Sequence, residues 1–307
     1  MRVAVVGLGR IGVEVARAVA ARPGMTLVAT VDVAPSVAGR PLAELVPEAA
    51  GVMIDRSLDD ALARGVEAVA LCTSSRAAAL EGDLARAVAA RAHVVSTCEE
   101  LTWPWEWPGA RPLDEAARAA GVTVVGTGVN PGFVMDRLAL QLAAVCVRVD
   151  GVRVERVVDA ARRRGPLRKK VGAGLTVEEF RAGVAAGRLG HVGLPASARL
   201  LAHGLGTSLG RTDETLDPVL DDEGRVLGVR QRLTATTADG RPIELGLQMS
   251  VGAPEPHDRV VIDGDPPLDV RVAGGTHGDR ATVGAVVDGL ARMPRAPRGL
   301  ITVVELY

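Results

Sequence analysis

The sequence predicts an α/β protein, with a Rossmann-type parallel-sheet domain followed by an α+β domain that holds a mixed or antiparallel sheet. The chain has 307 residues, which suits one or two domains of roughly 150 residues each. Its first part alternates short apolar runs with helical patterns, and the pattern changes to longer, polar-alternating runs after about Asp136. We therefore expect a first domain at 1–135, a second at 136–276, and a last segment, 277–307, that packs back on the first.

The first domain is expected to be doubly wound. Strands buried on both faces of a parallel sheet are typically short, continuous apolar runs, and such runs lie at 3–7, 26–33, 66–74, 92–98 and 122–128. Helical spacing separates them at 11–22, 58–65, 76–91 and 113–121. Strands that alternate with helices form βαβ units with right-handed crossovers, so this sheet should be parallel.

The second domain should begin with one long apolar helix at 133–147. Longer strands are expected at 153–163, 230–240, 242–252, 258–264 and 268–274, with a hairpin turn through Asp239 and Gly240. Helices are expected near 176–187 and 195–206, and a last helix at 278–294.

Composition excludes several classes of protein. The formal net charge is −1, whereas nucleic-acid and anionic-membrane binders usually carry a basic excess. No run of about 18 apolar residues predicts a membrane span, and the N-terminus lacks a signal-peptide pattern. Cys72, Cys98 and Cys146 lie far apart, which indicates neither a disulfide framework nor a zinc site. We expect a cytoplasmic protein without a metal.

A glycine-rich loop follows the first strand and opens the first helix. Its residues match the pattern G-x-G-x-x-G: Gly7, Leu8, Gly9, Arg10, Ile11 and Gly12. In that context the pattern predicts a dinucleotide site with the pyrophosphate at the helix N-terminus. Asp32, at the end of the second strand, suits the ribose hydroxyls of NAD. Arg10 and Arg40 suit the 2′-phosphate of NADP, so both cofactors stay open, as does a glycine turn without a ligand.

Ligands of open α/β sheets lie beyond the carboxyl ends of the strands. Three later strands end in polar residues, which should line the reacting half of the cofactor: Cys72, Thr73 and Ser74; Glu99 and Glu100; and Asn130.

The two adjacent glutamates are the candidates for proton transfer. A partly desolvated carboxylate beside a nicotinamide can act as a general acid/base. Adjacent residues point in different directions, so we expect only one of the two glutamates to face the cleft. We expect this to be Glu100, with Glu99 packed behind it. A solvated loop acid is the alternative on the residues alone.

Aromatic residues are only 2% of the chain, so the core should be aliphatic. Trp103 and Trp105 directly follow the glutamates, and Phe133 follows the neighbouring strand end. These rings would line an apolar substrate pocket. The alternative is that the tryptophans, with the prolines between them, form a rigid loop. His191 and Thr276 are further pocket candidates, with a helix start and an interdomain hinge as the alternatives. Lys169 and Lys170 suit a bound anion or a solvated basic face.

Several runs resemble the family of NAD(P)-dependent 2,4-diaminopentanoate dehydrogenases and amine dehydrogenases, with a dihydrodipicolinate reductase-like N-terminal domain. They are VVSTCEELTWPW, GTGVNPGFVMD, PLRKKVGAGLTVEEF, GHVGLPASARL and GGTHGDRAT. The resemblance implies that Glu100, or Glu99 in another register, is the acid/base. The paired histidines of true dihydrodipicolinate reductases are missing from ARRRGPLRKKVGAG, which puts a pyridine-dicarboxylate substrate in doubt.

The resemblance implies reversible oxidative deamination of an amine with NAD(P), or reductive amination of a ketone or aldehyde with ammonia. The alternatives are a diamine or amino-ketone dehydrogenase, a carbonyl or imine reductase, and a non-enzymatic NAD(H)-sensing module. We expect small-molecule partners and a homodimer formed through the second-domain sheet.

Overall fold

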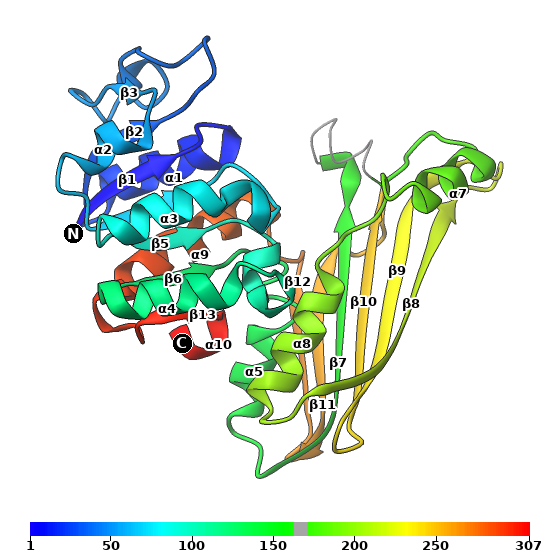
Figure 1. Cartoon of the computed structure of the whole chain (residues 1–307). Coiled ribbons are helices and arrows are strands. Elements are labelled where there is room, and N and C mark those ends of the chain that lie inside the picture. Colours follow the sequence, from blue (N-terminus) through cyan, green and yellow to red (C-terminus); the bar gives the residue numbers. More distant parts are fainter. Residues whose placement is uncertain (163–170) are drawn as a thin grey trace. The chain divides into compact units, whose positions relative to one another are not determined.

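The computed structural model describes residues 1–162 and 171–307. It divides into two compact units, one of residues 1–132 with 277–307 and one of residues 133–276. Each unit is built on one β-sheet (Figure 1). The first sheet is parallel and the second is mixed, so the predicted fold class is confirmed.

The first unit holds a seven-stranded sheet in the order β13-β6-β5-β4-β1-β2-β3. All of its pairings are parallel. Its strands are β1 (Arg2–Val6), β2 (Thr26–Val31), β3 (Ile54–Asp55), β4 (Ala68–Leu71), β5 (His93–Ser96), β6 (Thr123–Gly126) and β13 (Gly299–Ile301). The strand order reverses beside β1, where β2 pairs on one side and β4 on the other. Such a switch point is where open α/β sheets bind ligands.

Helices cover both faces of this sheet. Helices α1 and α9 pack together on one face, and α2, α3 and α4 cover the other (Figure 1). The helices are α1 (Arg10–Ala21), α2 (Leu58–Leu62), α3 (Glu81–Ala89), α4 (Ala110–Ala120), α9 (Gly278–Arg292) and α10 (Val303–Leu306). Short 3-10 helices are η1 (Leu42–Glu44), η2 (Ala77–Leu80), η3 (Glu100–Thr102), η4 (Pro104–Glu106) and η6 (Met293–Arg295). The buried cluster between the sheet and α2–α4 consists of Val, Leu, Ala and Cys side chains.

The second unit holds a six-stranded sheet in the order β12-β11-β7-β10-β9-β8. Only β7 and β10 pair in parallel; the other neighbours are antiparallel. The strands are β7 (Arg148–Asp159), β8 (Leu209–Leu220), β9 (Val226–Thr237), β10 (Pro242–Ser250), β11 (His257–Asp265) and β12 (Leu268–Ala273). The helices are η5 (Ala160–Arg162), α5 (Arg137–Ala143), α7 (Val177–Ala185) and α8 (Leu194–Gly204). Helices α5 and α8 pack on one face of the sheet (Figure 1).

The predicted helix at 133–147 is wrong in extent, because α5 spans only Arg137–Ala143. Asp136 has a non-helical backbone, and its carboxylate accepts a hydrogen bond from the N–H of Arg137, so it caps the helix start. Val134 and Met135 are fully buried in the turn before it. Burial, not helical periodicity, therefore explains the apolar residues there.

The long strand β8 was not predicted. It is an edge strand whose side chains are mostly exposed, so its sequence lacks the alternation of apolar and polar residues that marks a half-buried strand. The hairpin through Asp239 and Gly240 is present between β9 and β10, and Gly240 has a φ of 89°. In the part of the chain that the structure describes, no helix is long and apolar enough to cross a membrane.

Candidate active site

The glycine-rich loop lies between β1 and α1. Gly7 has a φ of 87°, and a Cβ there would lie 2.8 Å from the carbonyl oxygen of Cys72. A Cβ at Gly12 would lie 1.7 Å from the carbonyl oxygen of Gly7, so helix and loop touch at this point. A Cβ at Gly9 would meet no atom within 4 Å. Two glycines are thus required by the backbone, and the third leaves open space at the N-terminus of α1, which fits a pyrophosphate.

Asp32 braces this loop. Its Oδ2 accepts a hydrogen bond of 2.6 Å from the N–H of Leu8, and its Oδ1 accepts one of 2.8 Å from the N–H of Ala34. A carboxylate has about four lone-pair sites, so Asp32 retains acceptor capacity for ribose hydroxyls. The sequence predicted that Asp32 binds the ribose hydroxyls, but it did not predict these hydrogen bonds to the backbone of Leu8 and Ala34.

The two arginines that suit a 2′-phosphate both contact carboxylates. The Nε of Arg10 lies 3.4 Å from the Oδ2 of Asp279 on α9. Arg40 pairs with Glu44 and donates a 3.0 Å hydrogen bond to the carbonyl of Ser36. Helices α1 and α9 also line a cavity of about 360 Å³ beside the loop, formed by Arg10, Ile11, Glu14, His277, Asp279, Arg280 and Val283.

The carboxyl ends of β4, β5 and β6 share one edge of the sheet, because Leu71 pairs with Ser96 and Ser96 with Gly126. The hydroxyl of Ser96 donates to the carbonyl of Leu71 and accepts from the N–H of Cys98. This edge carries the three predicted groups: Cys72, Thr73 and Ser74; Glu99 and Glu100; and Asn130. The structure therefore brings their backbones to one side of the first sheet.

The thiols at this edge are not activated. Burial raises the pKa of Cys72 to about 12 and that of Cys98 to about 11. Both thiols stay protonated near neutral pH, and a thiolate nucleophile is not available from either.

The two glutamates have different surroundings. The Oε2 of Glu100 accepts a 2.8 Å hydrogen bond from the N–H of Ala77 at the start of η2, and its Oε1 lies 3.7 Å from Arg76. The Glu100 side chain is 46% exposed. Glu99 is half-buried, and its Oε2 atom is buried. Glu100 thus orders the loop after β4, whereas Glu99 is the carboxylate withdrawn from water.

The tryptophan segment separates into different environments. Trp103 is half-buried, and Trp105, in η4, is 43% exposed. Trp107 packs against the core of α3 and α4, where a Cβ at Gly109 would lie 2.3 Å from its ring. One ring of the three therefore belongs to the core, and Trp103 and Trp105 remain the pocket candidates.

The remaining pocket candidates are distributed over the two units. Asn130 belongs to the first unit, and Phe133, His191 and Thr276 to the second. The guanidinium of Arg137 lies 4.9 Å from the centre of the Phe133 ring. The backbone of His191 is bound on both sides by the side-chain amide of Gln231, at 2.9 and 2.7 Å. Lys169 and Lys170 lie outside the described residues.

Thr276 is anchored by a buried ion pair. The side chains of Arg156 and Asp258 are 5% and 1% exposed, and their Nη1 and Oδ1 atoms lie 3.5 Å apart. Arg156 donates to the carbonyl of Thr276 at 2.8 Å, and Asp258 accepts from its N–H at 2.7 Å. Thr276 is the last residue of the second unit, so these contacts fix the point where the chain leaves that unit.

The described residues, 1–162 and 171–307, contain no group of three or more His, Cys, Asp or Glu side chains placed to hold a metal ion.

Two family models cover most of the chain. Residues 1–98 match the N-terminal domain of dihydrodipicolinate reductase. Residues 133–307 match the C-terminal domain of 2,4-diaminopentanoate dehydrogenase, which is more than half of the chain. The chain belongs to the 2,4-diaminopentanoate dehydrogenase family. The family resemblance expected from the sequence is therefore confirmed.

Relatives of known identity agree with this membership. The 2,4-diaminopentanoate dehydrogenase of Acetoanaerobium sticklandii is 26% identical over 333 aligned positions, covering 100% of this chain and 93% of the relative. The structure of an amine dehydrogenase from Mycobacterium smegmatis superposes with a TM-score of 0.82 at 21% identity, covering 99% of this chain and 95% of that one.

A more distant structure shows the same fold with a cofactor. The scyllo-inositol dehydrogenase of Lactobacillus casei, solved with NAD(H), has a TM-score of 0.59 at 17% identity, covering 89% of this chain and 76% of that one. The expected class, a dehydrogenase that uses a nicotinamide cofactor, agrees with the family and with this fold.

Proposed function

We propose that this chain catalyses the reversible NAD-dependent oxidative deamination of an amine, and the reductive amination of a ketone or aldehyde with ammonia in reverse. The observation that carries the proposal is a glutamate pair at the carboxyl end of β5, on the sheet whose first strand leads into the glycine-rich loop. The first unit supplies the cofactor site and the glutamate pair, and the second unit supplies the subunit interface.

The overall reaction is R2CH–NH3⁺ + NAD⁺ + H2O giving R2C=O + NH4⁺ + NADH + H⁺. The cofactor, when bound, accepts the hydride from the carbon that carries nitrogen. This transfer requires an uncharged nitrogen, so a carboxylate must first take one ammonium proton. After it releases that proton to solvent, the same carboxylate takes a proton from the water that attacks the iminium carbon. In reverse, the carboxylic acid protonates the departing hydroxyl of the carbinolamine.

The burial of the two side chains favours Glu99 for this proton transfer. A carboxylate that is partly removed from water is suited to general acid–base catalysis near neutral pH. The Glu100 side chain is 46% exposed and accepts a hydrogen bond from the Ala77 N–H. Glu99 is half-buried, and its Oε2 atom is buried. We assign Glu99 as the acid/base and Glu100 as the residue that orders the loop after β4, which reverses the preference drawn from the sequence.

A diamine substrate is the second candidate, because the relative from Acetoanaerobium sticklandii is named for 2,4-diaminopentanoate. The exposed ring of Trp105 and the half-buried ring of Trp103 follow the glutamates directly. Aromatic rings attract ammonium groups as well as apolar ones. We propose that these rings and Asn130 contact the substrate within the first unit; Phe133, His191 and Thr276 of the second unit stay predictions.

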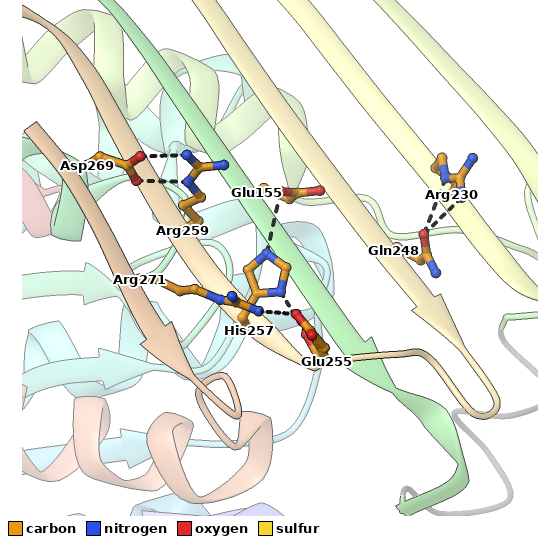
Figure 2. A network of polar contacts seen from close by, with 8 residues as sticks. All are labelled: Glu155, Arg230, Gln248, Glu255, His257, Arg259, Asp269 and Arg271. Atoms are coloured by element: carbon orange, nitrogen blue, oxygen red, sulfur yellow. Dashed lines mark hydrogen bonds and ion pairs between the residues drawn. The ribbon is translucent and has the colours of Figure 1, made fainter.

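The second sheet offers a surface for a second copy of the chain. Helices α5 and α8 cover one face, and the other carries charged side chains of both signs paired across strands. Figure 2 shows Arg259 with Asp269, Arg271 with Glu255, and His257 with Glu155. A second copy related by a two-fold axis can place positive side chains opposite negative ones, so we propose a homodimer.

The three free cysteines suit a reducing, cytoplasmic location.

The direct test measures NADH oxidation with a panel of ketones, aldehydes and amino-ketones, with and without ammonium. We expect turnover that depends on ammonium. Activity without ammonium would indicate a carbonyl reductase, and NADH binding without any turnover would indicate a sensing module. A preference for amino-ketones over plain ketones would favour the diamine candidate.

Two matched substitutions test the assignment of the base. Glu99→Gln should lower kcat about 100-fold or more while NADH still binds, since general acid–base catalysis contributes roughly 10²–10⁴-fold. Glu100→Gln should retain most of the turnover. The opposite ranking, with both variants binding NADH, would assign the base to Glu100.

A further inference from the structure

We propose that Asp279 and Glu44 set the cofactor preference of this chain toward NAD, by occupying the two arginines that a 2′-phosphate would need. The inference rests on the proposed cofactor site at the glycine-rich loop and goes beyond the part played there by Asp32. It assigns a role to two acidic residues that lie outside the glycine pattern.

Arg10 lies inside the glycine pattern and is the first residue of α1. Its Nε lies 3.4 Å from the Oδ2 of Asp279, the second residue of α9. Arg10 remains 53% exposed and also lines the cavity between α1 and α9. The guanidinium therefore lies at a ligand-accessible surface, with a carboxylate of the C-terminal segment beside it.

Arg40 lies in the connection that runs from Asp32 to η1. It forms an ion pair with Glu44, the last residue of η1, and its Nη1 donates to the carbonyl of Ser36. The backbone carbonyl of Arg40 accepts a hydrogen bond from the N–H of Ile54 in β3. The backbone of Arg40 is thus fixed at the edge of the sheet, and its side chain is directed by Glu44.

These two pairs change the electrostatics that a 2′-phosphate would meet. A phosphate monoester carries a charge of about −1.5 to −2 at pH 7 and is best recognised by arginines that present two N–H groups. Each arginine here forms a pair with a net charge near zero, and Asp32 adds a negative charge at the end of β2. NAD lacks the 2′-phosphate, so its binding does not require either arginine to leave its carboxylate.

Arg56, which follows β3, is a cation near this connection that does not change in the comparison. Arg56 donates a 3.4 Å hydrogen bond to the carbonyl of Ala38. It is the same in the wild type and in the variants below, so a change in the ratio of affinities reports on Asp279 and Glu44.

The test compares the dissociation constants of NADH and NADPH by nicotinamide fluorescence for the wild type and for Glu44→Gln with Asp279→Asn. The matched control is Glu48→Gln with Asp288→Asn, because it removes two carboxylates from nearby exposed ion pairs with Arg17 and Arg292. Exposed pairs are worth about 0.2–1 kcal/mol each. Freeing both arginines should therefore raise the affinity for NADPH relative to NADH by about two- to thirtyfold.

The control variant should leave the ratio within about twofold of the wild type. An unchanged ratio in the Glu44→Gln, Asp279→Asn variant, with NADH still bound, would refute this inference and leave the proposed function intact. An equal rise in both variants would show a general charge effect and would also refute it. Failure of the wild type to bind either nucleotide would refute the proposed function itself.

Discussion

Two substitutions in the glycine loop should have different effects, one on cofactor binding and the other on the stability of the fold. Gly9→Ala and Gly12→Ala each add one methyl group to the same loop. The added Cβ at position 9 would meet no atom within 4 Å, whereas at position 12 it would lie 1.7 Å from a backbone oxygen. The first substitution should affect the ligand, and the second should affect the fold.

The magnitudes follow from these surroundings. Gly9 has φ −61° and ψ −179°, which alanine adopts freely. At an N-cap alanine is worse than glycine by roughly 0.5–1 kcal/mol. Alanine also restricts the unfolded chain, which stabilises the fold by about 0.4–1 kcal/mol. The two effects nearly cancel, so the free energy of unfolding should change by less than about 0.5 kcal/mol. Its methyl group should nevertheless keep a pyrophosphate from the backbone and weaken NADH binding by about tenfold or more.

Gly12→Ala requires the backbone of Gly7 or of α1 to move. Overpacking of this kind costs typically about 1–3 kcal/mol and occasionally more, which corresponds to a fall in Tm of roughly 2–4 °C per kcal/mol for a domain of this size. Differential scanning calorimetry and NADH fluorescence titration measure the two effects. If Gly9→Ala bound NADH as the wild type does, the loop would not be the phosphate site. If Gly12→Ala kept the wild-type Tm, the close approach of α1 and the loop would be wrong.

Two further predictions concern stability. Burial, with a smaller contribution from Arg298, lowers the pKa of the His93 imidazole to about 4. As the pH falls from about 6.5 to 4, the unfolded chain therefore protonates this ring before the folded chain does, and the free energy of unfolding decreases. Because the ring is partly exposed, we expect a loss of about 1–2 kcal/mol. Urea unfolding of wild type and His93→Gln should show this difference, and parallel pH profiles would contradict it. Arg156→Met should cost about 3–5 kcal/mol, because it leaves the Asp258 carboxylate buried without its cation; a loss below 1 kcal/mol would show that the pair is not buried in solution.

The first sheet was predictable because its strands are covered on both faces. The runs 66–74 and 92–98 contain β4 and β5, and the apolar residues of these strands, Ala68–Leu71 in β4 and Val94 and Val95 in β5, are buried. The strands β3 and β13 have only two and three residues, too few for a periodic signal. Each pairs with one neighbouring strand, β3 with β2 and β13 with β6, and this is information that local sequence does not carry.

The candidate site was predictable where a motif sets the geometry locally. Gly7, Gly9 and Gly12 are close in sequence, and their backbone roles follow from the turn and the helix start that they form. The partners of Arg10 and of Thr276 were not predictable. Asp279 and Asp258 reach them through the folding of the C-terminal segment and of the second sheet.

The identity of the reaction product tests the central claim most directly. The chain would be incubated with NADH, a ketone from the active panel and ¹⁵N-labelled ammonium, and the product would be identified by mass spectrometry. The proposed chemistry at the end of β5 predicts an amine that carries the label, formed only when ammonium is present. An alcohol formed at the same rate with and without ammonium would contradict it.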